Sequence, residues 1–137
     1  MRILLRLFLV LNLFFSVAYT LDFKQTKIIK LKKDEQKKIL VKYENFIKTF
    51  EFRWTLYKNG GLVILRSYDK IVSQNILYKR YKNNSFRLEL KSRGKSKRYS
   101  VPYLLVKFED FDYKTFEATF KILLYDDTGK VSLKDLN

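Results

Sequence analysis

Two residue types are missing from the 137-residue sequence, which contains neither cysteine nor histidine. The absence of cysteine excludes disulfides, cysteine nucleophiles and lipid attachment through a cysteine. The absence of histidine excludes the Ser-His-Asp triad and the commonest metal ligand, and with both types missing the usual zinc sites cannot form. An enzyme would therefore have to rely on Asp, Glu, Lys, Tyr or Ser, for example on paired carboxylates or on a serine activated by a desolvated lysine.

The carboxylates that could form such a pair lie near the C-terminus, at Glu109, Asp110 and Asp112 and again at residues 126–127. In an extended chain Asp110 and Asp112 share one face, where they could bind calcium or act as acid and base. However, residues 126–129 (DDTG) have ordinary turn composition, and residues 109–112 are expected where a strand gives way to a loop. The sequence therefore predicts no catalytic residue, no metal site and no cofactor.

Proline, glycine and alanine are scarce, with one, four and two residues, against 21 lysines, 12 phenylalanines and 10 tyrosines. A hydrophobic content of 47% suffices to bury a core, so the composition indicates a folded protein. The length leaves room for one domain. An AT-rich genome, whose codons favour Lys, Asn, Phe, Ile and Tyr, would account for part of the lysine excess.

The N-terminus has the three parts of a secretory signal peptide. Arg2 and Arg6 supply positive charge, residues 7–17 (LFLVLNLFFSV) are apolar, and residues 16–18 (SVA) fit the small-x-small cleavage pattern. The alternative, an uncleaved anchor, is disfavoured because the apolar run is shorter than the roughly 20 residues that cross a bilayer. We predict cleavage near Ala18, a mature domain of residues 19–137 without a stable membrane span, and a periplasmic or secreted location. Export without disulfides fits a bacterial periplasm.

Apolar and polar residues alternate with period two along the mature chain, which predicts short strands separated by turns. The predicted strands are residues 23–32, 37–44, 50–56, 62–65, 74–81, 86–90, 99–108, 116–124 and 131–133. Seven to nine strands at this spacing predict an all-β fold, a single antiparallel β-sandwich of immunoglobulin-like architecture. A small β-barrel is one alternative. An α+β fold with a helix near residues 35–48 is another, because apolar residues there also recur at helical spacing.

The clearest local pattern is a hairpin around the only tryptophan. Phe50, Phe52, Trp54 and Leu56 alternate with polar residues, so all four are predicted to be buried. Residues 59–61 (NGG) follow and favour a tight turn, because Asn and Gly tolerate positive φ. The hairpin is therefore predicted to be scaffold and not a ligand platform.

Positive charge is the feature of the sequence that most indicates a function. After removal of residues 1–18 the chain carries 27 basic and 14 acidic residues, a net charge of +13. The charge is unevenly distributed: residues 79–98 carry +8, residues 24–42 carry +6 and residues 109–137 carry −3. A uniform lysine bias does not explain this polarity, although a solvated strand face beside a flexible loop remains an alternative to a functional surface.

The segment from residue 78 to residue 99 is predicted to bind a polyanion or an acidic partner, because tyrosines are interleaved with its cations. The predicted binding residues are Lys79, Arg80, Lys82, Arg87, Lys91, Arg93, Lys95, Lys97, Arg98, Tyr78, Tyr81 and Tyr99. Acidic protein surfaces, lipid phosphates and acidic glycans are the ligands an exported protein meets most often. Nucleic acid is attracted by the same field but is met less often outside the cell.

These features favour a non-catalytic exported binding or assembly protein of the bacterial cell envelope. It would be an accessory subunit that docks onto a protein partner, or onto an anionic envelope component, through its basic face or by strand addition at an exposed edge. Two other functions stay open, namely direct binding of anionic lipid, lipopolysaccharide or nucleic acid, and hydrolysis by carboxylates or a Ser–Lys pair.

Overall fold

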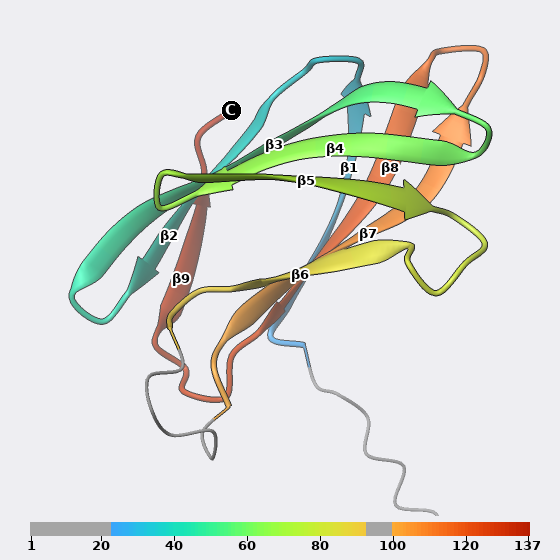
Figure 1. Cartoon of the computed structure of the whole chain (residues 1–137). Coiled ribbons are helices and arrows are strands. Elements are labelled where there is room, and N and C mark those ends of the chain that lie inside the picture. The colour runs from blue at the N-terminus through green and yellow to red at the C-terminus, as the bar shows by residue number, and fades with distance from the viewer. Residues whose placement is uncertain (1–22, 93–99) are drawn as a thin grey trace, which may run out of the picture.

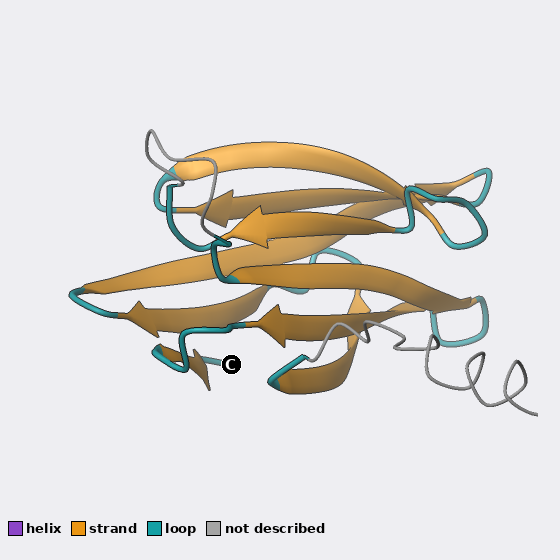
Figure 2. Ribbon diagram, turned by 90° about the horizontal axis from the view of Figure 1, so that it is seen from below, coloured by secondary structure: helices purple, strands orange, loops and turns teal. Residues whose placement is uncertain are grey.

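The computed structural model describes residues 23–92 and 100–137, so the predicted signal peptide lies outside the described residues. Every regular element in the described part is a strand (Figure 1, Figure 2). The strands are β1 (Gln25–Lys32), β2 (Lys37–Tyr43), β3 (Phe46–Lys58), β4 (Gly61–Tyr68), β5 (Ile71–Tyr78), β6 (Ser85–Glu89), β7 (Tyr103–Asp112), β8 (Glu117–Tyr125) and β9 (Val131–Asp135). The all-β prediction is confirmed, and β2 occupies the segment for which a helix was the alternative.

The strands form two antiparallel sheets, with the orders β1-β8-β7-β6 and β5-β4-β3-β2-β9 (Figure 1). The predicted β-sandwich is therefore confirmed. The chain crosses from one sheet to the other after β1, β5 and β8. In antibody domains the first two strands are neighbours in one sheet, whereas here β1 and β2 lie in different sheets.

Several strand boundaries differ from the prediction, and two of these differences have a clear local cause. β5 begins and ends three residues earlier than expected, because the chain reverses in a two-residue turn at Asp69 and Lys70, both with positive φ (50° and 67°). The strand predicted from residue 99 begins at Tyr103, directly after Pro102, which has no N–H for a sheet ladder. The sequence pattern did not reveal the turn at Asp69 and Lys70, because lysine is not a typical residue of a two-residue turn.

A β-bulge in β3 makes the predicted burial of Leu56 wrong. The pairing of β3 with β4 shifts between Trp54 and Leu56, so Thr55 is an extra residue and the two faces exchange beyond it. The three aromatic residues that precede the bulge in the predicted pattern are buried as expected. Leu56 is 49% exposed, and Tyr57 packs against the core in its place.

A second bulge lies in the other sheet, in β7. The pairing of β7 with β8 shifts between Phe108 and Asp110, which leaves Glu109 as the extra residue. Phe111 consequently turns inward and is buried. The prediction that a loop begins here is wrong, because β7 continues to Asp112 after the bulge.

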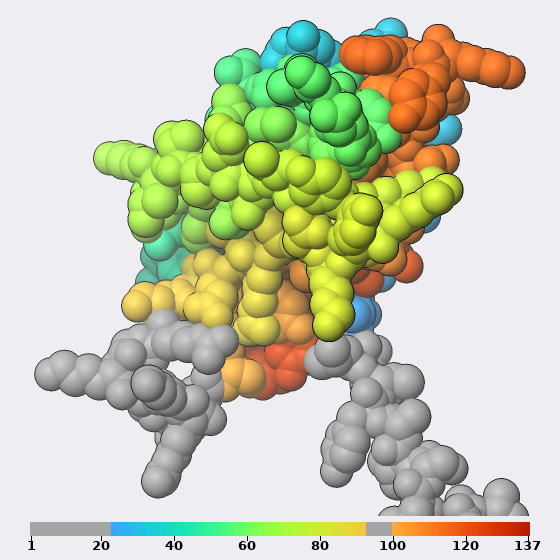
Figure 3. Space-filling view, turned by 45° about the vertical axis from the view of Figure 1, so that its right-hand side comes forward, coloured from blue at the N-terminus to red at the C-terminus, as the bar shows by residue number. Residues whose placement is uncertain are grey.

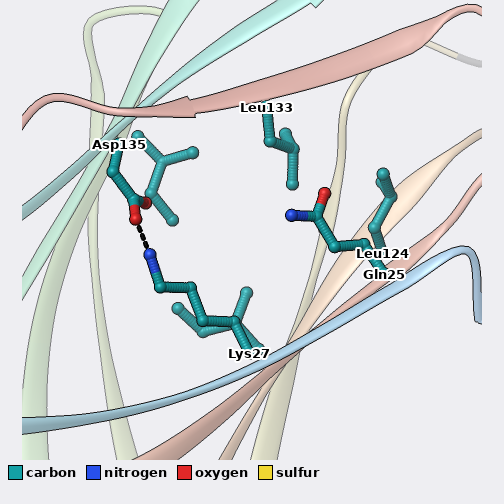
Figure 4. Close-up of a pocket in the computed structure, with 7 residues that line it drawn as sticks. Gln25, Lys27, Leu124, Leu133 and Asp135 are labelled. Atoms are coloured by element: carbon teal, nitrogen blue, oxygen red, sulfur yellow. Dashed lines mark ion pairs between the residues drawn. The ribbon is translucent and has the colours of Figure 1, made fainter.

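The two open sides of the sandwich are closed by side chains. On one side Lys27 of β1 forms an ion pair with Asp135 of β9, beside a small cavity of 80 Å³ that is also lined by Gln25 and Leu133 (Figure 4). On the other side the hydroxyl of Tyr68 donates a hydrogen bond to the carbonyl oxygen of Leu90 at 2.8 Å. The first contact joins the edge strands β1 and β9, and the second joins β4 to Leu90, the residue after edge strand β6.

Candidate binding surface at one end of the sandwich

Strand β6 divides the predicted binding residues between the two ends of the sandwich. Before it lie Tyr78, at the end of β5, and Lys79, Arg80, Tyr81 and Lys82 in the β5–β6 loop. Arg87 lies within β6 and Lys91 follows it. Arg93, Lys95, Lys97, Arg98 and Tyr99 lie outside the described residues. A five-residue strand spans about 17 Å, so the structure does not bring Lys79 and Lys91 together.

Three of the five described cations in the predicted set have a partner in the chain. Lys79 lies 2.6 Å from the carboxylate of Asp110, Lys91 lies 3.3 Å from that of Glu44, and the Arg87 guanidinium lies 3.7 Å from the centroid of the Tyr103 ring. Within residues 23–92 and 100–137 no ion pair joins Arg80 or Lys82 to a carboxylate. Among the described residues of the predicted set, the cations without a carboxylate or aromatic partner therefore lie in the β5–β6 loop.

Three turns meet at this end of the sandwich, which we call the loop end. They are residues 59–60 between β3 and β4, residues 79–84 between β5 and β6, and residues 113–116 between β7 and β8 (Figure 1). Side chains of the β5–β6 region project from the surface of the molecule (yellow-green in Figure 3). The turns surround a depression of 360 Å³, which is lined by Tyr57, Asn59, Gly60, Lys79, Arg80, Tyr81, Asp110, Phe111 and Tyr113.

The floor of the depression is aromatic and is built by the two β-bulges. Each bulge turns one aromatic residue inward, and the rings of Tyr57 and Phe111 stack with their centroids 4.0 Å apart. The hydroxyl groups of Tyr57 and Tyr113 lie 3.1 Å apart and share a hydrogen bond. This bond, together with burial, raises the pKa of Tyr57 to about 12. The floor is therefore uncharged over the physiological pH range.

The rim carries exposed side chains on a backbone held in place by local contacts. Tyr81 is 68% exposed and Tyr113 is 73% exposed. The ring of Tyr81 meets that of Tyr78 edge to face at 5.7 Å, and the Tyr81 N–H donates to the Tyr78 carbonyl oxygen at 3.2 Å. The Tyr78 ring itself covers Gly61, where a Cβ atom would come within 2.9 Å of the ring. The loop therefore presents Tyr81 from a fixed base.

Electrostatically the loop end is weakly positive. Asp110 and Lys79 neutralise each other, and the hydrogen bond from the Lys79 ammonium group lowers the pKa of Asp110. Arg80 lies beside this pair and supplies a cation without a described carboxylate partner. An arginine next to exposed tyrosines is suited to binding a carboxylate-bearing surface, because its guanidinium group donates two parallel hydrogen bonds.

Sequence reasoning found Lys79, Arg80 and Tyr81 but missed Tyr57, Phe111 and Tyr113. The period-2 pattern placed Tyr57 on the outer face and residues 109–112 in a loop, because the bulges that turn two aromatic residues inward leave no trace in that pattern. The one available signal was the aromatic density of residues 111–116 (FDYKTF), where three of six residues are aromatic.

Other chemical groups in the described residues are arranged structurally. Lys37 is buried, which lowers its pKa, and its ammonium group bonds the carbonyl oxygen of Asn137 at 2.5 Å and lies 3.4 Å from Asp135. Asp112 accepts hydrogen bonds from the N–H groups of the β7–β8 turn. In the described part of the chain, no three His, Cys, Asp or Glu side chains gather where they could hold a metal ion.

Comparison with known proteins adds no relative. No protein-family model, no curated protein and no solved structure matches the chain. Residues 23–92 and 100–137 contain no helix of the length and apolarity needed to span a membrane.

Proposed function

We propose that the protein is a non-catalytic binding subunit, exported to the bacterial cell envelope, that docks onto an acidic protein surface through its loop end. The observation that carries the proposal is the depression at the loop end, where exposed tyrosines and Arg80 from separate turns surround an aromatic floor. Docking at such a surface needs none of the catalytic groups that the chain lacks.

The composition of the loop end supports protein binding over binding of a small molecule. Tyrosine and arginine are the residues most enriched at the centres of protein interfaces, and loops rich in Tyr, Asn and Gly at one end of a β-sandwich are the recognition surface of antibodies. The depression is broad and open, and charged groups lie at its rim. Tyr81 and Tyr113 offer large apolar area with little conformational freedom to lose on binding.

The experiment is affinity capture from the cell envelope with the full-length protein and two variants. In the first variant Arg80→Glu and Tyr81→Ser remove the exposed cation and ring from the rim. The control is Lys130→Glu, which makes the same kind of charge reversal in the exposed β8–β9 turn at the other end. We expect one acidic partner to be retained by the wild type and the control at physiological salt, and lost by the first variant.

The magnitude of the loss follows from interface energetics. Removing two residues from the centre of an interface costs roughly 2 kcal/mol for each, which corresponds to a reduction in affinity of about 1,000-fold for the pair. Equal capture by the rim variant and the control would contradict the proposal. Turnover of a small molecule by the purified protein, with no partner captured, would contradict it as well.

Direct binding of a polyanion is the second candidate, and the net charge of +13 after removal of residues 1–18 favours it. Its signature is an affinity for anionic vesicles, lipopolysaccharide or single-stranded DNA that falls steeply as salt rises, because counterions are released. Reversal of Arg93, Lys95 and Lys97 to glutamate separates the two candidates. This triple variant should abolish polyanion binding and leave docking at the loop end intact.

A further inference from the structure

Strand β5 differs from the other edge strands of the sandwich. Edge strands are normally protected against pairing with another chain by short length or by lysine. β6 and β9 are five residues long, and β1 carries Lys27, Lys30 and Lys32. β5 is eight residues long, its sequence is IVSQNILY, and it contains no charged residue. Of the four edge strands in the described residues, β5 is therefore the one that has neither a short length nor a lysine.

The backbone of β5 points hydrogen-bonding groups away from the molecule. The N–H and C=O groups of Tyr78 bond Asn83 and Tyr81 of the following loop, so they point away from β4. In an antiparallel strand these directions alternate with period two. The N–H and C=O groups of Val72, Gln74 and Ile76 therefore also point outward, along the open edge of the sheet.

Two of these three outward-pointing residues, Val72 and Ile76, have apolar and exposed side chains. Val72 is 73% exposed and Ile76 is 46% exposed, and both lie on the outer face of the five-stranded sheet. Ile76 is paired with Val63 of β4, which is paired with Leu56 of β3, so an apolar row crosses three strands. The bulge that exposes Leu56 thus extends this apolar row to the third strand from the open edge.

We propose that two copies of this chain pair through β5, antiparallel, about a two-fold axis at Gln74. In this register Gln74 lies opposite Gln74 of the second copy, and Val72 lies opposite Ile76. All three positions are hydrogen-bonded pairs, since their backbone groups face the open edge. The product is a continuous ten-stranded sheet made from the two five-stranded sheets.

The ends of β5 limit the register. The chain reverses at Asp69 and Lys70, and at Tyr78 the outward N–H and C=O groups are already bonded by the β5–β6 loop. The open stretch of the edge is therefore centred on Gln74, and with the axis there Val72, Gln74 and Ile76 all pair with outward-pointing groups of the second copy. A shift of the axis by one residue in either direction leaves one of these three residues without such a partner in the open stretch.

A charge exchange tests both the pairing and its register. The variant Val72→Lys with Ile76→Lys places lysine opposite lysine, whereas Val72→Lys with Ile76→Glu places lysine opposite glutamate at the same two positions. By sedimentation equilibrium of the full mature chain at physiological salt we expect the wild type and the Lys/Glu variant to be dimers. The Lys/Lys variant should be a monomer, with its association weakened at least tenfold.

The absence of cysteine allows an independent measurement. Directly opposed Cα atoms of a hydrogen-bonded antiparallel pair lie about 5.5 Å apart, within the range that a disulfide spans. Gln74→Cys should give a covalent dimer on mild oxidation in dilute solution, and Thr26→Cys on the exposed edge of β1 should not.

Three results would overturn the proposal while leaving docking at the loop end untouched. The first is a wild type that is monomeric at submillimolar concentration. The second is equal association of the Lys/Lys and Lys/Glu variants when circular dichroism shows both to be folded. The third is equal cross-linking of the Gln74→Cys and Thr26→Cys variants. Loss of partner capture by the Arg80→Glu, Tyr81→Ser variant is measured separately, so the two proposals fail independently. Because two copies of like net charge repel, we also expect dimerisation to strengthen with salt, opposite to polyanion binding.

Discussion

The indole Nε1 of Trp54 donates a hydrogen bond of 2.8 Å to the carbonyl oxygen of Leu31. Trp54 lies in β3 and Leu31 in β1, so this bond joins the two sheets through the interior. The carbonyl oxygen of Trp54 in turn accepts a bond of 2.9 Å from the N–H of Asp34, in the connection between β1 and β2. The first crossing of the chain from one sheet to the other is therefore fixed to the central hairpin.

Replacing Trp54 by phenylalanine should lower the free energy of unfolding by about 1–3 kcal/mol beyond the effect of the smaller ring, because the buried Leu31 carbonyl oxygen loses its donor. Urea unfolding followed by circular dichroism measures the change. Tyr81→Phe is the comparison, since it removes a hydroxyl from an exposed ring and should leave the unfolding midpoint unchanged. A Trp54→Phe variant as stable as the wild type would show that this bond contributes nothing.

The bulge in β3 makes opposite predictions for two adjacent residues. Leu56→Lys should change stability by less than about 0.5 kcal/mol, because the side chain points outward. Tyr57→Lys should cost at least about 2 kcal/mol, because it removes the ring that stacks on Phe111. If the alternation continued unbroken through β3, Leu56→Lys would instead be the more destabilising of the two substitutions. Thermal unfolding of the two variants therefore decides whether β3 contains the bulge.

The hydrogen bond between Tyr57 and Tyr113 should be visible in a phenol titration. Tyr113→Phe removes it, and we expect the pKa of Tyr57 to fall from about 12 toward its ordinary value, followed by ultraviolet absorbance. Because the folded pKa is raised, the stabilisation from neutral Tyr57 is fully present below pH 10 or so and is lost as the pH rises through about 12. Tyr81→Phe is the matched control, and it should leave the Tyr57 titration unchanged.

Asp126 should make the fold sensitive to acid. Burial alone would raise its pKa, but hydrogen bonds from Thr128 and Val131 and the nearby ammonium group of Lys24 outweigh burial and lower it. The resulting stabilisation is present above the unfolded pKa of about 4 and is lost as the pH falls through the folded pKa. Asp126→Ala should lower the free energy of unfolding by about 2 kcal/mol at neutral pH. It should also make the decrease of that free energy at acid pH less steep, as measured by urea unfolding at a series of pH values. The adjacent exposed Asp127→Ala is the control, and it should cost less than about 0.5 kcal/mol at neutral pH.

The β-sandwich was predictable because most strands have one buried face. Phe50, Phe52 and Trp54 are spaced by two, and the same spacing recurs in β8, so burial requires extended chain at those positions. Turn chemistry added the hairpin at Asn59 and Gly60, whose φ angles are 53° and 78°. Strand order was not predictable, because alternation says which face is buried and not which strand lies alongside.

About half of the candidate site was predictable, because local composition identifies residues but does not say which strands pack together. Net charge and interleaved tyrosines pointed to the segment that contains Lys79, Arg80 and Tyr81. They could not show that β6 carries Lys91 to the opposite end, or that Asp110 neutralises Lys79. Ion pairs between residues far apart in the chain depend on the packing of strands, which local composition does not specify.

The sequence by itself determined the chemical limits of this protein: no cysteine or histidine chemistry, an excess of positive charge, and alternating strands that bury aromatic faces. Tertiary structure decided which side chains meet. Two single-residue bulges, at Thr55 and Glu109, exchange the faces of β3 and β7 and bring Tyr57 onto Phe111 at the loop end. Since a strand has period two, one inserted residue inverts every position after it, and only the pairing of neighbouring strands reveals where that insertion falls.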